Sequence, residues 1–238
     1  MEESSKEIQN NLFLTASITE NINVLQWIIE KFAEKKKEID GAIKAVDKTG
    51  NTVLHLAALL NNKQEIIKYL LAQGADREAR RIFQRTPFQL TVENKLNLEV
   101  PTLLLYKDQR DLKAKDEFGD TALHLASYFN TNQDTIENLL AKGADREARG
   151  RYQRTPSQCT VSNNSNLKVC ILLYNDQSDL TAKDEFGETA LHLAALVNTN
   201  QEIIKYLLGQ GADREARGRF KRTPVSYTHL TLPTILRV

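Results

Sequence analysis

The sequence is short of the residues that build disulfide frameworks and membrane spans. Among 238 residues it has two cysteines, one tryptophan and one methionine, and 7% of its residues are aromatic. Two cysteines, Cys159 and Cys170, do not make a framework, and a buried small thiol is the expected role of each. No apolar run approaches the length of a membrane span, and the polar N-terminus shows no secretory signal. These absences predict a soluble protein of a reducing, cytoplasmic compartment that does not bind membranes.

An excess of charge of either sign is also lacking. The 32 lysines and arginines nearly balance 31 acidic residues, so bulk charge gives no reason to expect nucleic-acid binding. The sequence has no glycine-rich phosphate loop, no Ser-His-Asp grouping outside repeated positions and no Cys/His cluster with metal spacing. Paired carboxylates such as Asp116 and Glu117 are expected on exposed turn tips, which do not favour a raised pKa. We therefore expect no enzymatic activity, no cofactor and no metal.

What the chain has in abundance is repetition. The stretch Thr-Val-Leu-His-Leu-Ala at residues 52–57 returns as Thr-Ala-Leu-His-Leu-Ala at 121–126 and 189–194. A turn ending in glycine precedes each copy, and Gly-Ala-Asp-Arg-Glu-Ala-Arg follows it. Weaker copies lie between them, with Thr-Pro-Phe-Gln at 86–89 and Thr-Pro-Ser-Gln at 155–158. Steps of 34 or 35 residues separate the threonines that start these helices: Thr52, Thr86, Thr121, Thr155, Thr189 and Thr223.

This pattern resembles the ankyrin repeat, in which a turn, a Thr-Pro-Leu-His-like helix start, a second helix rich in Leu and Ile, and Gly-Ala-Asp follow one another. The resemblance implies an all-α repeat solenoid of helix-turn-helix pairs with β-hairpin fingers. In that family the threonine caps the first helix and the histidine ties the turn to it. We expect this structural role for His55, His124 and His192, because histidines about 20 Å apart cannot share a metal ion.

The periodicity defines one extended domain over residues 8–224. We expect residues 1–7 to be disordered and residues 8–45 to form a divergent N-terminal capping repeat. Further repeats are expected at about residues 46–80, 81–115, 116–149, 150–183 and 184–217, with another starting at residues 218–224.

The last fourteen residues depart from the pattern. After Pro224 the repeat predicts a glutamine and an inner helix, as after Pro87 and Pro156. Residues 225–234 instead resemble one reading frame through the transposon-end adapter used in sequencing-library preparation. We interpret residues 225–238 as a non-native tail on a fragment, with a short genuine C-terminus as the alternative. Without a polar cap, the array is expected to fray from about Asp184 onward.

The weaker repeats differ from the others at matched positions. Glutamine replaces the turn glycine, the histidine and the glycine that ends the second helix. These glutamines are, in that order, Gln84 and Gln153, Gln89 and Gln158, and Gln109 and Gln177. Each difference is expected to cost up to about 1 kcal/mol. Local opening is therefore predicted to be easiest in the repeats that start at about Arg81 and Gly150.

The turns carry the strongest indication of binding, because acidic or neutral turns alternate with basic turns that contain an aromatic residue. Neighbouring turns about 10 Å apart can simply neutralise each other. Alternatively, their arginines and aromatics, which are enriched at interface hot spots, anchor an extended acidic or phosphorylated partner. The candidate partner-binding residues are Arg81, Phe83, Arg85, Phe118, Arg151, Tyr152, Arg154, Phe186, Arg219 and Phe220.

The sequence therefore predicts a protein-protein interaction module that binds on the concave face of its fingers and first helices, as adaptor, scaffold or inhibitor. The alternative is the targeting arm of a larger protein, such as an effector delivered into a host cell, with an enzymatic domain beyond residue 224. Nucleic-acid binding by the basic fingers is a weaker third hypothesis, because acidic turns interleave with them.

Overall fold

The computed structural model describes most of the chain from residue 43 onward, in two compact units, Met1–Glu117 and Phe118–Val238. The predicted disordered N-terminus, most of the predicted capping repeat, and Gln109 lie outside the described residues, as do residues 229–238. The described residues are 14–15, 23, 27, 41, 43–60, 64–93, 110–129, 132–163, 166–174, 177–197 and 201–228.

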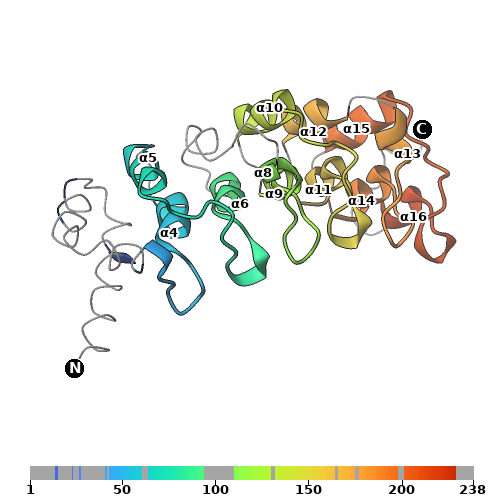
Figure 1. The fold of residues 1–238 in the computed structure, drawn as a ribbon. Coiled ribbons are helices and arrows are strands. Elements are labelled where there is room, and N and C mark those ends of the chain that lie inside the picture. Colours follow the sequence, from blue (N-terminus) through green and yellow to red (C-terminus); the bar gives the residue numbers. More distant parts are fainter. Residues whose placement is uncertain are drawn as a thin grey trace. The chain divides into compact units, whose positions relative to one another are not determined.

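The first unit contains the helices of two successive repeats (Figure 1). Helix α4 (Val53–Leu60) is followed by α5 (Gln64–Ala72) and packs against both α5 and α6 (Pro87–Glu93). A three-residue 3₁₀ turn, η2 (Ile82–Gln84), precedes α6, and the short helix α8 (Arg110–Lys113) comes later in the chain.

The second unit has two rows of helices (Figure 1). The row of first helices contains α9 (Ala122–Tyr128), α11 (Pro156–Asn163), α14 (Ala190–Val197) and α16 (Pro224–Thr228), each packed against the next. The row of second helices contains α10 (Gln133–Ala141), α12 (Leu167–Leu173) and α15 (Gln201–Gly209). The short α13 (Gln177–Thr181) and the 3₁₀ turns η3 (Arg151–Gln153) and η4 (Arg219–Lys221) complete it.

The core of the second unit lies between its two rows. Leu191 and Leu193 of α14 meet Ile203, Ile204 and Leu207 of α15, and all five side chains are buried. Each buried side chain of this size stabilises the fold by about 1.5 to 3 kcal/mol. Because these residues recur at helical spacing, one helix pair buries only one face and the next pair covers the other.

Both cysteines occupy buried positions in this unit, as the sequence predicted. Cys159 and Cys170 are free thiols. Burial raises the pKa of each to about 12, so neither forms a thiolate at neutral pH.

The first helices begin as the threonine-histidine pattern predicted. The Thr121 side chain accepts a hydrogen bond from the backbone amide of His124, and the His124 ring accepts one from the amide of Thr121. The Thr52 amide likewise donates to Nδ1 of His55 over 3.2 Å, and that of Thr189 to His192 over 3.2 Å. Each pair satisfies amides that a helix start would leave without partners.

The ends of the second helices confirm one prediction and correct another. Gly74, with φ +88°, ends α5: its amide donates to Leu71 and that of Ala75 to Leu70. This reciprocal pair is the Schellman motif, and Gly143 and Gly211 repeat it. The prediction that Gln177 replaces such a glycine is wrong. Helix α12 already ends before Tyr174, and Gln177 is the first residue of α13.

The chain continues as a helix where the repeat pattern stops. Residues after Thr223 form α16, whose Val225 and Tyr227 pack against the core. Ser226 takes the place of the histidine, and its hydroxyl accepts a hydrogen bond from the Thr223 amide over 3.3 Å. The interpretation of residues 225–238 as a non-native tail stays a prediction.

Candidate interaction surface on the turns

The basic turns have an unusual backbone. Phe83, Tyr152 and Phe220 have φ between 57° and 63°, and the residue after each is also left-handed. Two consecutive left-handed residues are typical of a type I′ turn, which favours glycine and asparagine. A bulky aromatic there is strained, and such strain concentrates at functional sites. Among the described residues, the fingers contain no strand and one isolated bridge, between Val46 and Thr52.

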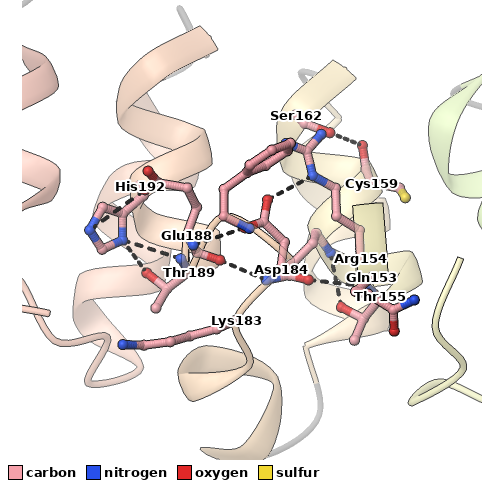
Figure 2. A network of polar contacts seen from close by, with 12 residues as sticks. Gln153, Arg154, Thr155, Cys159, Ser162, Lys183, Asp184, Glu188, Thr189 and His192 are labelled. Atoms are coloured by element: carbon pink, nitrogen blue, oxygen red, sulfur yellow. Dashed lines mark hydrogen bonds and ion pairs between the residues drawn. The ribbon is translucent and has the colours of Figure 1, made fainter. Parts of the chain in front are cut away.

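In two basic turns, the last arginine forms an ion pair with an aspartate of the following turn. Nε of Arg154 lies 3.1 Å from Oδ2 of Asp184, and the same distance joins Arg85 to Asp116. Figure 2 shows Arg154 reaching Asp184 from the preceding turn. Both aspartate side chains are fully buried. The expectation that Asp116 lies on an exposed tip is therefore wrong: it lies beneath the arginine of the preceding turn.

The first arginine of each basic turn is also structural. Nη1 of Arg149 donates to the carbonyl of Gln153 over 2.9 Å and to that of Lys183 over 3.0 Å. Arg80 bonds to equivalent carbonyls in the first unit. These arginines connect their own turn to the backbone segment that leads into the following turn.

The arginines at the tips have a different environment. The guanidinium of Arg151 lies 3.6 Å from the centroid of the Phe118 ring and 5.8 Å from that of Tyr152. Within the described part of the second unit, this guanidinium makes no ion pair. Cation-π contacts at exposed sites are worth about 0.5 to 1 kcal/mol each, enough to orient the side chain without neutralising its charge.

Arg219 repeats this arrangement. Its guanidinium lies 5.1 Å from the Phe186 centroid and 4.9 Å from that of Phe220, and it too has no ion pair among the residues described. The rings of Tyr152 and Phe186 lie 5.6 Å apart and connect the two groups. We call the resulting row the fingertip ladder: Phe118, Arg151, Tyr152, Phe186, Arg219 and Phe220.

Six of the ten candidate residues therefore come together in the ladder, and four do not. Arg85 and Arg154 form the buried ion pairs described above. In the first unit, Phe83 is 44% exposed and lies 5.7 Å from the Arg85 guanidinium, while the amide of Arg81 donates to the carbonyl of Arg85. Arginines that the sequence pattern did not distinguish therefore have different partners: some form ion pairs with buried aspartates, and others lie against aromatic rings.

A contact between successive turns was not predicted. The Arg151 amide donates to Oδ1 of Asp120 over 2.8 Å, and the Arg219 amide to Oε1 of Glu188 over 3.1 Å. A Cβ at Gly150 would overlap Oδ1 of Asp120. Gly218 stands in the same relation to Glu188. The sequence signal is this pairing of an acid with a glycine thirty residues later.

The histidines connect repeats as well as turns. A backbone amide can only donate, so Nδ1 of His124 is the acceptor and Nε2 carries the proton. That nitrogen lies 3.0 Å from the carbonyl oxygen of Arg154, in the following turn. His55 and His192 make the equivalent bonds. The pKa of His55 is lowered from 6.5 to about 4, mainly by burial; the bond to the Arg85 carbonyl raises it in part, and the nearby charge of Arg81 adds to the lowering.

Glutamine reproduces these bonds in the weaker repeats. Oε1 of Gln158 accepts the Thr155 amide over 3.0 Å, and its Nε2 donates to the carbonyl of Glu188 over 3.2 Å. Gln89 accepts the Thr86 amide in the same way. Glutamine in place of histidine therefore still bonds the amide at the start of the helix, and Gln158 also bonds the turn that follows.

Within the described ranges, no group of three or more His, Cys, Asp or Glu side chains could hold a metal ion. None of the helices described is both long and apolar enough to cross a membrane.

The helix pairs stack, and hydrogen bonds join each turn to the next. This arrangement defines a repeat solenoid. Its residues match the family model for ankyrin repeats (three copies) in four overlapping segments, 3–81, 61–149, 88–184 and 158–228. The chain belongs to the ankyrin repeat family, whose domains are protein-interaction domains.

Several relatives share these repeats. Over 76% of this chain, a homologue of transient receptor potential cation channel subfamily A member 1 from Caenorhabditis elegans is 31% identical. The human channel subfamily A member 1 is 31% identical over 70% of the chain. Ankyrin repeat protein OPG189 of Variola virus is 30% identical over 71%. The matched regions are 14%, 15% and 30% of these relatives, so the chain spans a minor part of each.

Among solved structures, the ankyrin repeat domain of Bcl-3 superposes with a TM-score of 0.73. It covers 90% of this chain and 92% of its own, at 24% sequence identity. This likeness confirms the predicted all-α ankyrin fold.

Proposed function

We propose that this domain binds a partner protein along the fingertip ladder of the second unit, and that the partner presents an acidic or phosphorylated segment. One observation supports this above all: Arg151 and Arg219 project two guanidinium groups that aromatic rings hold in place and that no described acid neutralises. In contrast, the neighbouring Arg154 is already paired with Asp184.

The chemistry of the ladder suits such a partner. A guanidinium held over aromatic rings has lost much of its rotational freedom before binding, and its edge still offers a fork of donors for a carboxylate or phosphate. Exposed rings beside it supply apolar contact area, since Tyr152 is 45% and Phe220 75% exposed. The proposed roles are those of an adaptor, scaffold or inhibitor, with the first helices lining the same concave face. The free thiols of Cys159 and Cys170 support a reducing, cytoplasmic location.

The test measures binding of a fluorescent decaglutamate peptide to the whole chain. We expect Arg151→Gln with Arg219→Gln to weaken binding about tenfold, because both charges are lost while the backbone bonds to Asp120 and Glu188 are kept. The matched control is Lys68→Gln with Lys168→Gln, which removes the same charge from exposed positions on α5 and α12. This control should bind like the wild type.

Equal weakening by both double variants would show that only net charge matters and would overturn the proposal. So would a single-stranded oligonucleotide that binds more tightly than the peptide and loses affinity in the Arg151→Gln, Arg219→Gln variant, because the partner would then be a nucleic acid.

The targeting-arm hypothesis remains a second proposal. It is supported by the relatives, in which the matched region is a minor part of a longer chain. Long-read sequencing of the source locus across the codons for Thr223 and Pro224 would test it. Reads that continue into an enzymatic domain would support it, and reads that reach a capping repeat and then a stop codon would contradict it.

A further inference from the structure

The fingertip ladder contains the same group of side chains twice. The first clamp is Arg151 with Phe118 and Tyr152, and the second is Arg219 with Phe186 and Phe220. Every member of the second clamp follows its counterpart by 68 residues: 186 − 118, 219 − 151 and 220 − 152 are all 68. The two clamps are therefore related by a step of two repeats.

The backbone presents the two clamps in the same way. Arg151 follows Gly150 and donates its amide to Asp120, while Arg219 follows Gly218 and donates its amide to Glu188. Tyr152 and Phe220 have φ of 58° and 57°. The two guanidinium groups consequently have equivalent supports, and one kind of ligand group fits both.

The same step recurs on the first helices. Tyr128 at the end of α9 is 43% exposed, and Leu196, which follows it by 68 residues near the end of α14, is 50% exposed. Ser162 occupies the corresponding place on the intervening α11. Exposed apolar residues and exposed arginines thus both recur once in every two repeats.

The two-repeat step determines the distance between the clamps, and hence the length of the segment that can span them. Packed helices lie about 8 to 10 Å apart, so two repeats advance by about 16 to 20 Å. An extended chain rises about 3.3 Å per residue and covers that distance in five or six residues. The Tyr152–Phe186 contact closes the space between the clamps, so a bound segment can remain in contact with the ladder from one clamp to the other.

We propose that the two clamps form a bivalent site for one extended protein segment with carboxylate side chains five or six residues apart. A carboxylate is planar and pairs edge to edge with a guanidinium, and each clamp holds one guanidinium close to two rings. This inference rests on the proposed function and adds the spacing and the valency of the ligand.

The experiment uses the whole chain and peptides with two Glu-Glu pairs separated by one, four or seven prolines. A polyproline spacer is stiff and rises about 3.1 Å per residue, so four prolines place the centres of the two pairs six residues, or about 19 Å, apart. We expect the four-proline peptide to bind about tenfold more tightly than a peptide with one Glu-Glu pair, because the second contact becomes intramolecular. The one- and seven-proline peptides should bind like the single pair.

Arg219→Gln is the matched control, since it leaves the first clamp intact. In this variant all the peptides should bind like the single pair. Equal affinities for the three spacers in the wild type, or an unchanged preference for four prolines in Arg219→Gln, would overturn the bivalent site. The proposed function has its own readout in this experiment: it fails if the single pair binds the wild type and the Arg151→Gln, Arg219→Gln variant equally.

Discussion

The basic turn of the first unit and those of the second share a backbone but differ in their connection to the preceding turn. Arg81 has φ −107°, and so does Gly150. The glycine is therefore not required by its own conformation. It is required because Asp120 reaches past it to the next amide. In the first unit Asn51 stands in place of the acid, and its Nδ2 bonds within its own turn, to Asp47. A glycine in one repeat can thus be dictated by a carboxylate in another.

The largest predicted effect concerns the connection that both units share. Asp184→Ala should lower the free energy of unfolding by about 3 kcal/mol or more, because it leaves the Arg154 guanidinium without its buried partner. Asp116→Ala should cost a similar amount in the first unit, where the distance to Arg85 is the same. Urea denaturation, with hydrogen exchange to assign the unit, measures both. A loss confined to one variant would break the equivalence of the two ion pairs.

The next effect tests the difference between the units. Gly150→Ala should destabilise the second unit by about 3 kcal/mol, because a methyl group would overlap Asp120 and His124. Arg81→Gly makes the reverse exchange in the first unit and should gain no bond between turns.

Gly209→Ala is the control, since nothing lies within 4 Å of the added methyl group. An alanine in a helix should be neutral or stabilising there. If Gly150→Ala unfolds at the same urea concentration as the wild type, the close approach of Asp120 does not require glycine.

A smaller effect distinguishes histidine from glutamine. The folded pKa of His55 is about 4, below its usual 6.5, so the unfolded state binds more protons between these values. The stability that neutral His55 provides is complete above about pH 6.5 and falls as the pH approaches 4. Between pH 7 and 5 the loss is about 2 kcal/mol.

His55→Gln should remove this loss and keep the hydrogen bonds that Gln89 and Gln158 make. Unfolding curves at pH 7 and pH 5 measure it for the first unit. Parallel losses in wild type and variant would assign the pH dependence to other groups.

The smallest effect concerns the strained turn. Gln153→Gly should stabilise the second unit by about 0.5 to 1 kcal/mol, because φ of 55° costs glycine less. It should leave decaglutamate binding unchanged, since Gln153 is not part of the ladder. Reduced peptide affinity would show that the strain helps to place Tyr152.

The repeat pattern predicted the helices and their caps because it depends on local geometry. Thr121 and His124 are three residues apart on one helix turn, so their bonds follow from spacing. Which arginine of a basic turn forms the ion pair could not be predicted in this way. Arg151 and Arg154 belong to the same turn, and only the stacking of the next turn decides which of them meets the buried Asp184.

The weaker repeats make hydrogen bonds that the sequence pattern alone did not indicate. Gln158 was expected to cost stability, yet its amide group presents an acceptor and a donor in the places of the two histidine nitrogens. The left-handed φ of Gln153 keeps part of the expected penalty. Easier opening of the repeats that start at about Arg81 and Gly150 therefore stays a prediction, and hydrogen exchange as slow there as in the flanking repeats would contradict it.

The bonds from histidine or glutamine to the turn that follows also bear on how such a chain can lengthen. His124 reaches the Arg154 carbonyl and His192 reaches that of Arg222, so each link ends on a main-chain atom that every amino acid possesses. A gene segment that encodes two repeats can be copied and inserted without first evolving a matching surface. The coupling between old and new parts is inherited with the copy, and arginines and rings at the tips are free to diverge.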